Sequence, residues 1–92
     1  MNGGKYYMYV QVYINDVYSL LEHLWSGGYD RYNKLSLNDK DVIFTVLNEY
    51  QYDTGIVLSI TDINDWLWFE FGSLVQLCND YGYHLNVRCN NV

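Results

Sequence analysis

Acid–base catalysis could draw an imidazole from only two residues of this chain, His23 and His84. A catalytic site usually combines a nucleophile, a base and an oxyanion donor. Neither histidine lies in a recognisable motif that would supply the other two groups. His23 falls in the polar gap of an expected helix and His84 on the polar face of an expected strand, so we interpret both as surface residues. The sequence predicts no catalytic residues and a protein that is not an enzyme.

Phosphate, zinc and calcium sites each need a residue pattern that this chain lacks. The pairs Gly3-Gly4 and Gly27-Gly28 do not have the spacing that wraps a pyrophosphate. A structural zinc site needs about four paired Cys or His ligands, whereas the cysteines and histidines here are scattered. Two sets of possible calcium ligands lack the full calcium-loop pattern and are explained more simply as helix caps: Asp39 with Asp41, and Asp62 with Asn64 and Asp65. We therefore predict no metal and no cofactor.

The composition indicates one small folded domain, residues 1–92. Half of the residues are hydrophobic, 18 % are aromatic and the formal net charge is -6. This hydrophobicity argues against disorder, and the acidic charge argues against direct binding to nucleic acid or to an anionic membrane. No apolar run reaches the roughly 18 to 20 residues of a membrane span, and the start lacks the regions of a signal peptide. We expect a cytoplasmic protein in which Cys78 and Cys89 are reduced, a single disulfide being the alternative.

Hydrophobic periodicity in the first half predicts a strand followed by helices. Residues 6–14 alternate as a strand does, and an apolar stripe from Val17 to Leu24 predicts a helix that Gly27 and Gly28 end. The segment 29–35 fits either a helical turn or a loop. Ser36 followed by Asp39 predicts the capped start of a helix whose apolar stripe runs over 42–50.

The second half predicts two more helices and a closing strand. Gly55 should break the preceding helix, and 56–60 should be an extended connection or a small strand. Ser59 or Thr61 should cap a helix beginning near Asp62, with a break at Gly72 and Ser73. A short fourth helix should end at Gly82, and residues 83–89 alternate as a strand. The predicted fold is therefore α+β: the N- and C-terminal strands form one small sheet packed against three or four short helices.

One segment, residues 62–70, carries more large apolar side chains than one helix face can bury. Trp66, Leu67, Trp68 and Phe69 are consecutive, so some of them must point away from the main core. One interpretation places Ile63, Trp66, Leu67 and Phe71 in the core and leaves Trp68 and Phe69 to fill a neighbouring contact. The other makes Trp68 and Phe69 part of a partner interface, where exposed aromatic residues act as binding hot spots.

Tyrosines and carboxylates form a second feature. Tyrosine recurs at recognition surfaces, and carboxylates spread over a small surface could imitate a phosphate backbone in the basic groove of a nucleic-acid-binding protein. An ordinary solvated acidic surface is the alternative. The candidate partner-binding residues are Tyr7, Tyr9, Tyr13, Glu49, Asp53, Asp62, Asp65, Trp68, Phe69 and Glu70.

The middle of the chain, from Leu24 to Tyr83, resembles short acidic proteins of phages and conjugative elements of Gram-positive bacteria. The resemblance rests on Trp25-Ser26-Gly27-Gly28, on a helix such as 39–50, and on the aromatic run 61–70, which ends in Phe69-Glu70. Such relatives commonly end their final helix with leucine, glycine and tyrosine, where this chain has the sequence of 80–83. Small acidic proteins of mobile elements include anti-CRISPR and anti-restriction proteins, several of which block the nucleic-acid site of a defence complex.

The resemblance implies a non-enzymatic inhibitor that binds a bacterial defence complex, either a CRISPR effector or a restriction enzyme, in the host cytoplasm. An alternative is an assembly adaptor that uses Trp68 and Phe69 to form a homodimer or to join a larger protein. A small enzyme or ligand-binding protein ranks last, because the sequence has no set of acid, base and nucleophile.

Overall fold

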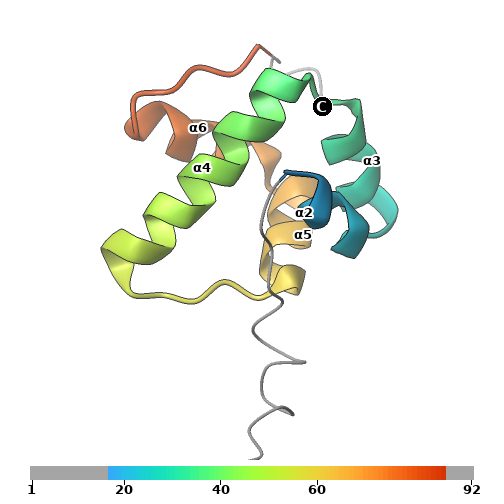
Figure 1. Cartoon of the computed structure of the whole chain (residues 1–92), viewed down its shortest axis with the longest axis horizontal. Coiled ribbons are helices and arrows are strands. Elements are labelled where there is room, and N and C mark those ends of the chain that lie inside the picture. Colours follow the sequence, from blue (N-terminus) through green and yellow to red (C-terminus); the bar gives the residue numbers. More distant parts are fainter. Residues whose placement is uncertain (1–16, 87–92) are drawn as a thin grey trace, which may run out of the picture.

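The computed structural model describes residues 17–86, and helices are the only regular secondary structure in this part of the chain. The helices are α2 (Val17–His23), α3 (Ser26–Lys34), α4 (Leu37–Thr54), α5 (Ile60–Phe69) and α6 (Phe71–Asp80). Helix α5 packs against α3 on one side and α6 on the other, and α4 lies along α6 (Figure 1). None of the described helices is both long enough and apolar enough to cross a bilayer.

The predicted α+β fold is wrong, because the described residues contain no strand. The expected strand 6–14 lies outside those residues, as do 87–89 of the closing strand. Residues 83–86 are irregular, and two of their backbone donors bond to helical residues. The Tyr83 N–H bonds to the Cys78 carbonyl at 2.9 Å, and the Asn86 N–H donates to both carboxylate oxygens of Asp39 at 3.0 and 3.2 Å. The acceptors of these backbone groups are therefore a carbonyl of α6 and a buried carboxylate of α4, not a neighbouring strand.

Capping residues set both ends of α4, as predicted. The Ser36 hydroxyl accepts a hydrogen bond from the Asp39 N–H, and Gly55 ends the helix with a φ of 75°, which favours glycine. The Asp39 carboxylate, in contrast, does not return to Ser36: it is fully buried and holds Asn86. The predicted apolar stripe over 42–50 lies within α4, which extends beyond the stripe at both ends.

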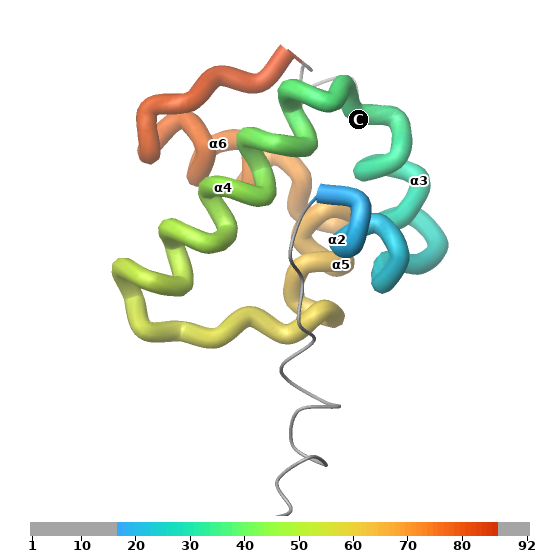
Figure 2. Tube along the Cα trace, viewed as in Figure 1, coloured from blue at the N-terminus to red at the C-terminus, as the bar shows by residue number. Residues whose placement is uncertain are grey.

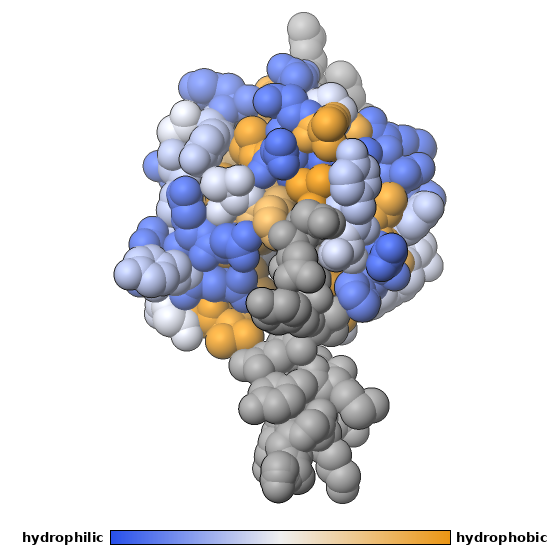
Figure 3. All heavy atoms as spheres, viewed as in Figure 1, coloured by the Kyte–Doolittle hydropathy of each residue, from blue (hydrophilic) through white to orange (hydrophobic). Residues whose placement is uncertain are grey.

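The connection from α4 to α5 is extended rather than a strand, and Figure 2 shows it running along one end of the molecule. The side-chain oxygen of Gln51 accepts from the Leu58 N–H at 2.7 Å. Ser59 then caps α5, as one of the two predicted residues, in a complete capping box with Asp62. Figure 3 shows an apolar patch at the lower left, on the side where Figure 1 places the connection from α4 to α5. Ile56 and Val57 of this connection are exposed.

Two predicted helix breaks occur earlier than predicted: α2 ends at His23, before Gly27 and Gly28, and α5 ends at Phe69, before Gly72. Gly27 and Gly28 lie in the first turn of α3, so the undecided segment 29–35 is mostly helical. A Cβ on Gly27 would overlap the Trp68 indole, and one on Gly28 would overlap the Asn64 side chain. These glycines therefore allow α3 and α5 to approach closely, which is a packing role rather than a helix stop.

The second break occurs at Glu70, two residues before the predicted position. Glu70 has a φ of -133° and ψ of 43°, and α6 begins at once with Phe71. Gly72 and Ser73 lie within α6. This helix ends shortly before Gly82, as predicted, and Gly82 has a φ of 91°. The change of direction at Glu70 turns Phe71 into the core, where it is 3 % exposed.

The core is one cluster of buried residues to which all five described helices contribute, with Tyr32 coming from α3. The Tyr32 hydroxyl, although buried, donates a hydrogen bond to the Val17 carbonyl at 3.2 Å. Cys78 is buried and free, and burial raises the pKa of its thiol to about 11, with the Asp39 charge a smaller cause. Cys89 lies outside the described residues. The buried hydrophobic residues are Val17, Leu20, Leu24, Tyr32, Leu35, Ile43, Val46, Leu47, Ile63, Leu67, Phe71, Leu74 and Cys78.

Candidate functional site

The outer side of α5 carries five of the predicted partner-binding residues. Ile63 and Leu67 face the core, as expected, and Trp66 is half-buried with its ring edge-on to Tyr50. Asn64 is buried beside them, and the positions on the opposite side of the helix face solvent. The exposed residues of the predicted set on this helix and at its end are Asp62, Asp65, Trp68, Phe69 and Glu70.

Trp68 and Phe69 stack on each other at the end of α5. Their ring centroids lie 4.4 Å apart and the ring planes differ by 17°. Trp68 is 39 % exposed and Phe69 is 66 % exposed. The Trp68 indole lies against the bare Cα of Gly27, so the neighbouring helix holds one ring of the pair in place. The expectation that these rings fill a second buried contact holds for one side of Trp68 only.

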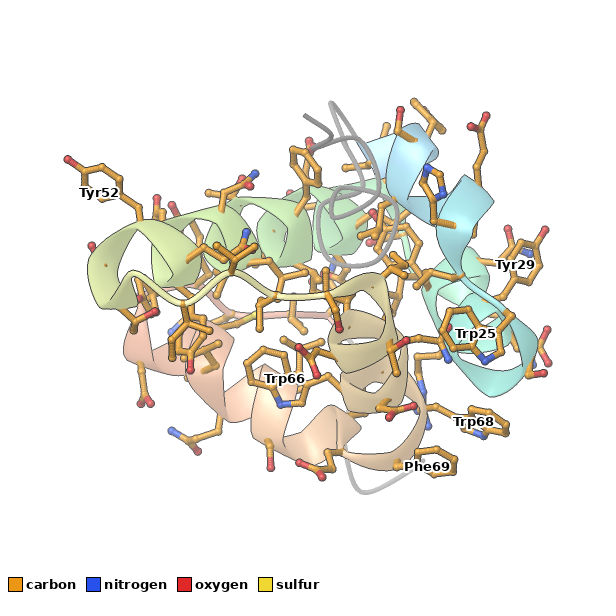
Figure 4. All side chains as sticks on the ribbon, turned by 90° about the horizontal axis from the view of Figure 1, so that it is seen from below. Trp25, Tyr29, Tyr52, Trp66, Trp68 and Phe69 are labelled. Carbon is orange, nitrogen blue, oxygen red and sulfur yellow. The ribbon has the colours of Figure 1, made fainter. Side chains whose placement is uncertain are left out.

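Helix α3 adds two aromatic residues that the sequence analysis did not assign to the site. Trp25 and Tyr29 are 40 % and 39 % exposed, and they lie on the same side of the molecule as Trp68 and Phe69 (Figure 4). We call these four residues the aromatic face. Trp25 is the extended N-cap residue of α3, and the Tyr29 N–H donates to its carbonyl at 3.1 Å. Their signal in the sequence was the presence of two large aromatic residues on either side of the two glycines.

Asn64 fixes the position of Trp25 relative to α5. Its side chain is fully buried, and its Oδ1 accepts the Trp25 N–H at 2.9 Å. Gly28 makes room for this amide. Ser26, between Trp25 and Gly27, has a φ of 47°, a conformation that costs non-glycine residues about 1 kcal/mol or more. The Asn64 hydrogen bond and the close packing of α3 on α5 therefore hold a sharp turn that presents Trp25.

Arg31 of α3 contacts both α5 and α6 close to the aromatic face. Its Nε donates to the Leu67 carbonyl at 3.2 Å, near the negative end of the α5 dipole, and its guanidinium lies 4.6 Å from the centroid of the Phe71 ring. Burial lowers the pKa of Arg31 from its ordinary value. This cation therefore joins α3, α5 and α6.

Charge is unevenly distributed along the chain. Residues 41–86 contain no lysine and no arginine, so the carboxylates of α5 have no basic neighbour on α5 or α6. Within 17–86 the basic residues are Arg31, Lys34 and Lys40. The carboxylates of 41–86 are Asp41, Glu49, Asp53, Asp62, Asp65, Glu70 and Asp80.

The predicted site residues do not all come together. Glu49 and Asp53 lie near the C-terminal end of α4, where Tyr52 is at the opposite end of the molecule from Trp68 and Phe69 (Figure 4). Asp53 accepts a hydrogen bond from the Tyr81 hydroxyl at 2.9 Å, and burial together with this bond raises the pKa of Tyr81. Tyr7, Tyr9 and Tyr13 lie outside the described residues.

The histidines and carboxylates of the described residues form no compact chemical centre. His23 is exposed at the end of α2, and His84 is exposed in the segment after α6. Between residues 17 and 86 no three His, Cys, Asp or Glu side chains are placed to hold a metal ion together. The candidate site in this part of the chain is therefore a binding surface: the exposed rings of the aromatic face beside the carboxylates of α5.

Comparisons of the chain with protein-family models, with curated proteins and with solved structures returned no match.

Proposed function

We propose that the protein is a non-enzymatic inhibitor of a bacterial defence nuclease complex, acting in the host cytoplasm. Its aromatic face, with the α5 carboxylates beside it, would dock on the basic groove of a CRISPR effector or restriction enzyme. Occupation of that groove would exclude the nucleic acid. The observation that carries the proposal is the exposed stack of Trp68 and Phe69 next to Asp65 on a helix without basic residues.

The aromatic residues would supply most of the affinity. Large aromatic side chains at the centre of an interface are frequent hot spots, and each costs about 2 kcal/mol or more when truncated. Asp65 lies three and four positions before Trp68 and Phe69, so helical geometry puts its carboxylate beside the rings. Carboxylates at the rim would attract a basic groove from a distance and orient the encounter.

A homodimeric adaptor is the second candidate, because a second copy could also cover Trp68 and Phe69. The charges of α5 disfavour this arrangement. A two-fold symmetric contact places the same patch of both copies face to face, so the α5 carboxylates of one copy would approach those of the other. Like charges brought together in an interface are unfavourable. A basic partner surface meets no such repulsion.

Binding to purified proteins tests the proposal. The full chain is titrated into a CRISPR effector nuclease and, separately, into a restriction endonuclease, with binding followed by calorimetry and cleavage of target DNA as the second readout. We expect binding to one of the two, inhibition of its cleavage, and a loss of affinity as salt rises. Salt-insensitive self-association without binding to either enzyme would favour the adaptor.

Two matched pairs of variants connect the binding to the surface. Phe69→Ala should weaken binding about 10- to 100-fold, whereas Tyr52→Ala, which removes an even more exposed ring at the far end, should leave it unchanged. Asp65→Lys should lower the association rate more than Asp80→Lys, although both change the net charge equally. Equal effects within either pair would contradict docking through this face.

A further inference from the structure

We propose that the Trp68–Phe69 stack imitates two successive bases of a single nucleic-acid strand, and that its target is a groove that binds single strands. The inference rests on the proposed function and narrows it. Of the two enzyme classes named above, it selects the CRISPR effector, whose channel receives a single-stranded guide, over a restriction enzyme, which receives a duplex.

The geometry of the two rings is that of stacked bases. The planes differ by 17° and the centroids lie 4.4 Å apart, an offset stack of flat π systems. The outer ring, Phe69, leaves 66 % of its surface open. An aromatic side chain of a partner could therefore extend the stack, as it does on a base.

The pair is held ready for binding. The inner ring lies against Gly27, where the absence of a Cβ lets the indole pack on the backbone of α3. Both residues belong to the last turn of α5, and Arg31 bonds the carbonyl of the residue before them. Little side-chain entropy is then lost on binding, which favours affinity.

Three carboxylates lie close to the stack in sequence, and in our proposal they take the part of the phosphates that accompany bases. Asp65 lies one helical turn before the rings, Asp62 precedes it by three positions on the same side, and Glu70 follows Phe69 directly. All three are exposed, and α5 and α6 contribute no cation that would neutralise them. Grooves for single strands bind the bases on aromatic side chains and the phosphates along a basic track. The stacked rings would take the place of the bases, and the acidic groups that of the phosphates.

A duplex-binding groove fits this surface less well. In a duplex the bases are stacked on one another inside the helix, so proteins contact the phosphates and the groove edges. Such a groove offers basic and polar side chains but no platform for an exposed ring face. Stacking against aromatic side chains is the mode of single-strand recognition. The exposed face of Phe69 would contribute little to a duplex site.

Competition experiments separate the two kinds of groove. The full chain is bound to a CRISPR effector nuclease free of guide RNA, or to a restriction endonuclease, and the complex is challenged with an oligonucleotide of about 20 nucleotides. The oligonucleotide is supplied either single-stranded or as the duplex of the same sequence. We expect binding to the guide-free effector, displacement by the single strand, and at least about tenfold weaker binding once guide RNA is loaded.

The Phe69→Leu variant separates a base-like ring from an ordinary apolar contact. Leucine keeps much of the apolar area and removes the flat face, so we expect it to lose affinity about as much as Phe69→Ala, by roughly 10-fold or more. Phe69→Tyr keeps the ring and should restore binding. Far-ultraviolet circular dichroism confirms that each variant is folded, as expected for a side chain outside the core.

Each outcome has a defined meaning. Displacement by duplex alone, binding to the restriction endonuclease alone, or full affinity of Phe69→Leu would overturn the single-strand inference and leave the proposed inhibitor function standing. Absence of binding to both enzymes would overturn the two proposals together. A dimer that dissociates when Phe69 is replaced by alanine would show that the aromatic face binds a second copy of this chain.

Discussion

Gly28→Ala should destabilise the protein, although alanine is the better helix former. At an open helical position the exchange gains up to about 1 kcal/mol from helix propensity. At Gly28 the new Cβ would overlap Asn64, whose side chain is fully buried between α3 and α5. Overpacking costs about 1–3 kcal/mol. Displacing the amide would also break its hydrogen bond to the Trp25 N–H, at about 1 kcal/mol more. The expected net loss in the free energy of unfolding is about 1–3 kcal/mol.

Gly72→Ala is the matched control. Gly72 also lies in the first turn of a helix, α6, and no atom outside its immediate surroundings lies within 4 Å of the position that a Cβ would take. This variant should gain about 0.5–1 kcal/mol. Urea denaturation followed by circular dichroism measures both variants against the parent, and in thermal melts each kcal/mol corresponds to about 4–8 °C. Equal stabilisation by the two substitutions would refute the close contact of α3 with α5.

Three further predictions concern the caps and buried groups. Ser59→Ala should lower the free energy of unfolding by about 1 kcal/mol through loss of the α5 cap, while Ser73→Ala, which removes an exposed hydroxyl within α6, should change it by less than about 0.5 kcal/mol; denaturant midpoints decide. Asp39→Ala should lower it by about 1–3 kcal/mol and speed exchange of the Asn86 amide hydrogen in NMR, whereas Asp41→Ala should not; an unchanged exchange rate would contradict the contact. Folding raises the pKa of the Cys78 thiol from 9.0 to about 11, so the neutral thiol stabilises the fold below pH 9. This contribution should fade between pH 9 and 11. Over that range the free energy of unfolding of Cys78→Ala should therefore fall less than that of the parent protein.

The sequence predicts the helices best where one side chain closes a cap within its own turn. Ser36, Gly55 and Ser59 all act at the expected positions, because a cap depends only on residues a few positions away. The prediction that Ile63 and Leu67 face the core is likewise confirmed, since their spacing fixes one face of α5. Phe71 is in the core as well, but as the first residue of α6, beyond the change of direction at Glu70.

The errors arise where a distant partner decides the structure. Gly27 and Gly28 look like a helix stop, and only the presence of Asn64 and Trp68 on α5 explains them as a packing surface. The alternation over 83–86 looks like a strand, but its donors go to α6 and to Asp39. For the site, α5 supplied a correct local set of exposed residues, whereas the separation of Glu49 and Asp53 from it depends on the arrangement of helices in space.

The hydrogen bonds between Asp39 and Asn86 also order the steps of folding. Donor and acceptor are 47 residues apart, so the bond can form only after α4 and α6 have been brought together. Closing so long a loop early would carry a large entropy cost for one contact. We therefore expect residues 83–86 to dock last and to detach first, as a small cooperative unit that opens while the helices stay assembled. Its opening would take Tyr83 and Leu85 off the core, and within residues 17–86 we expect a protease to cut this segment before the helices.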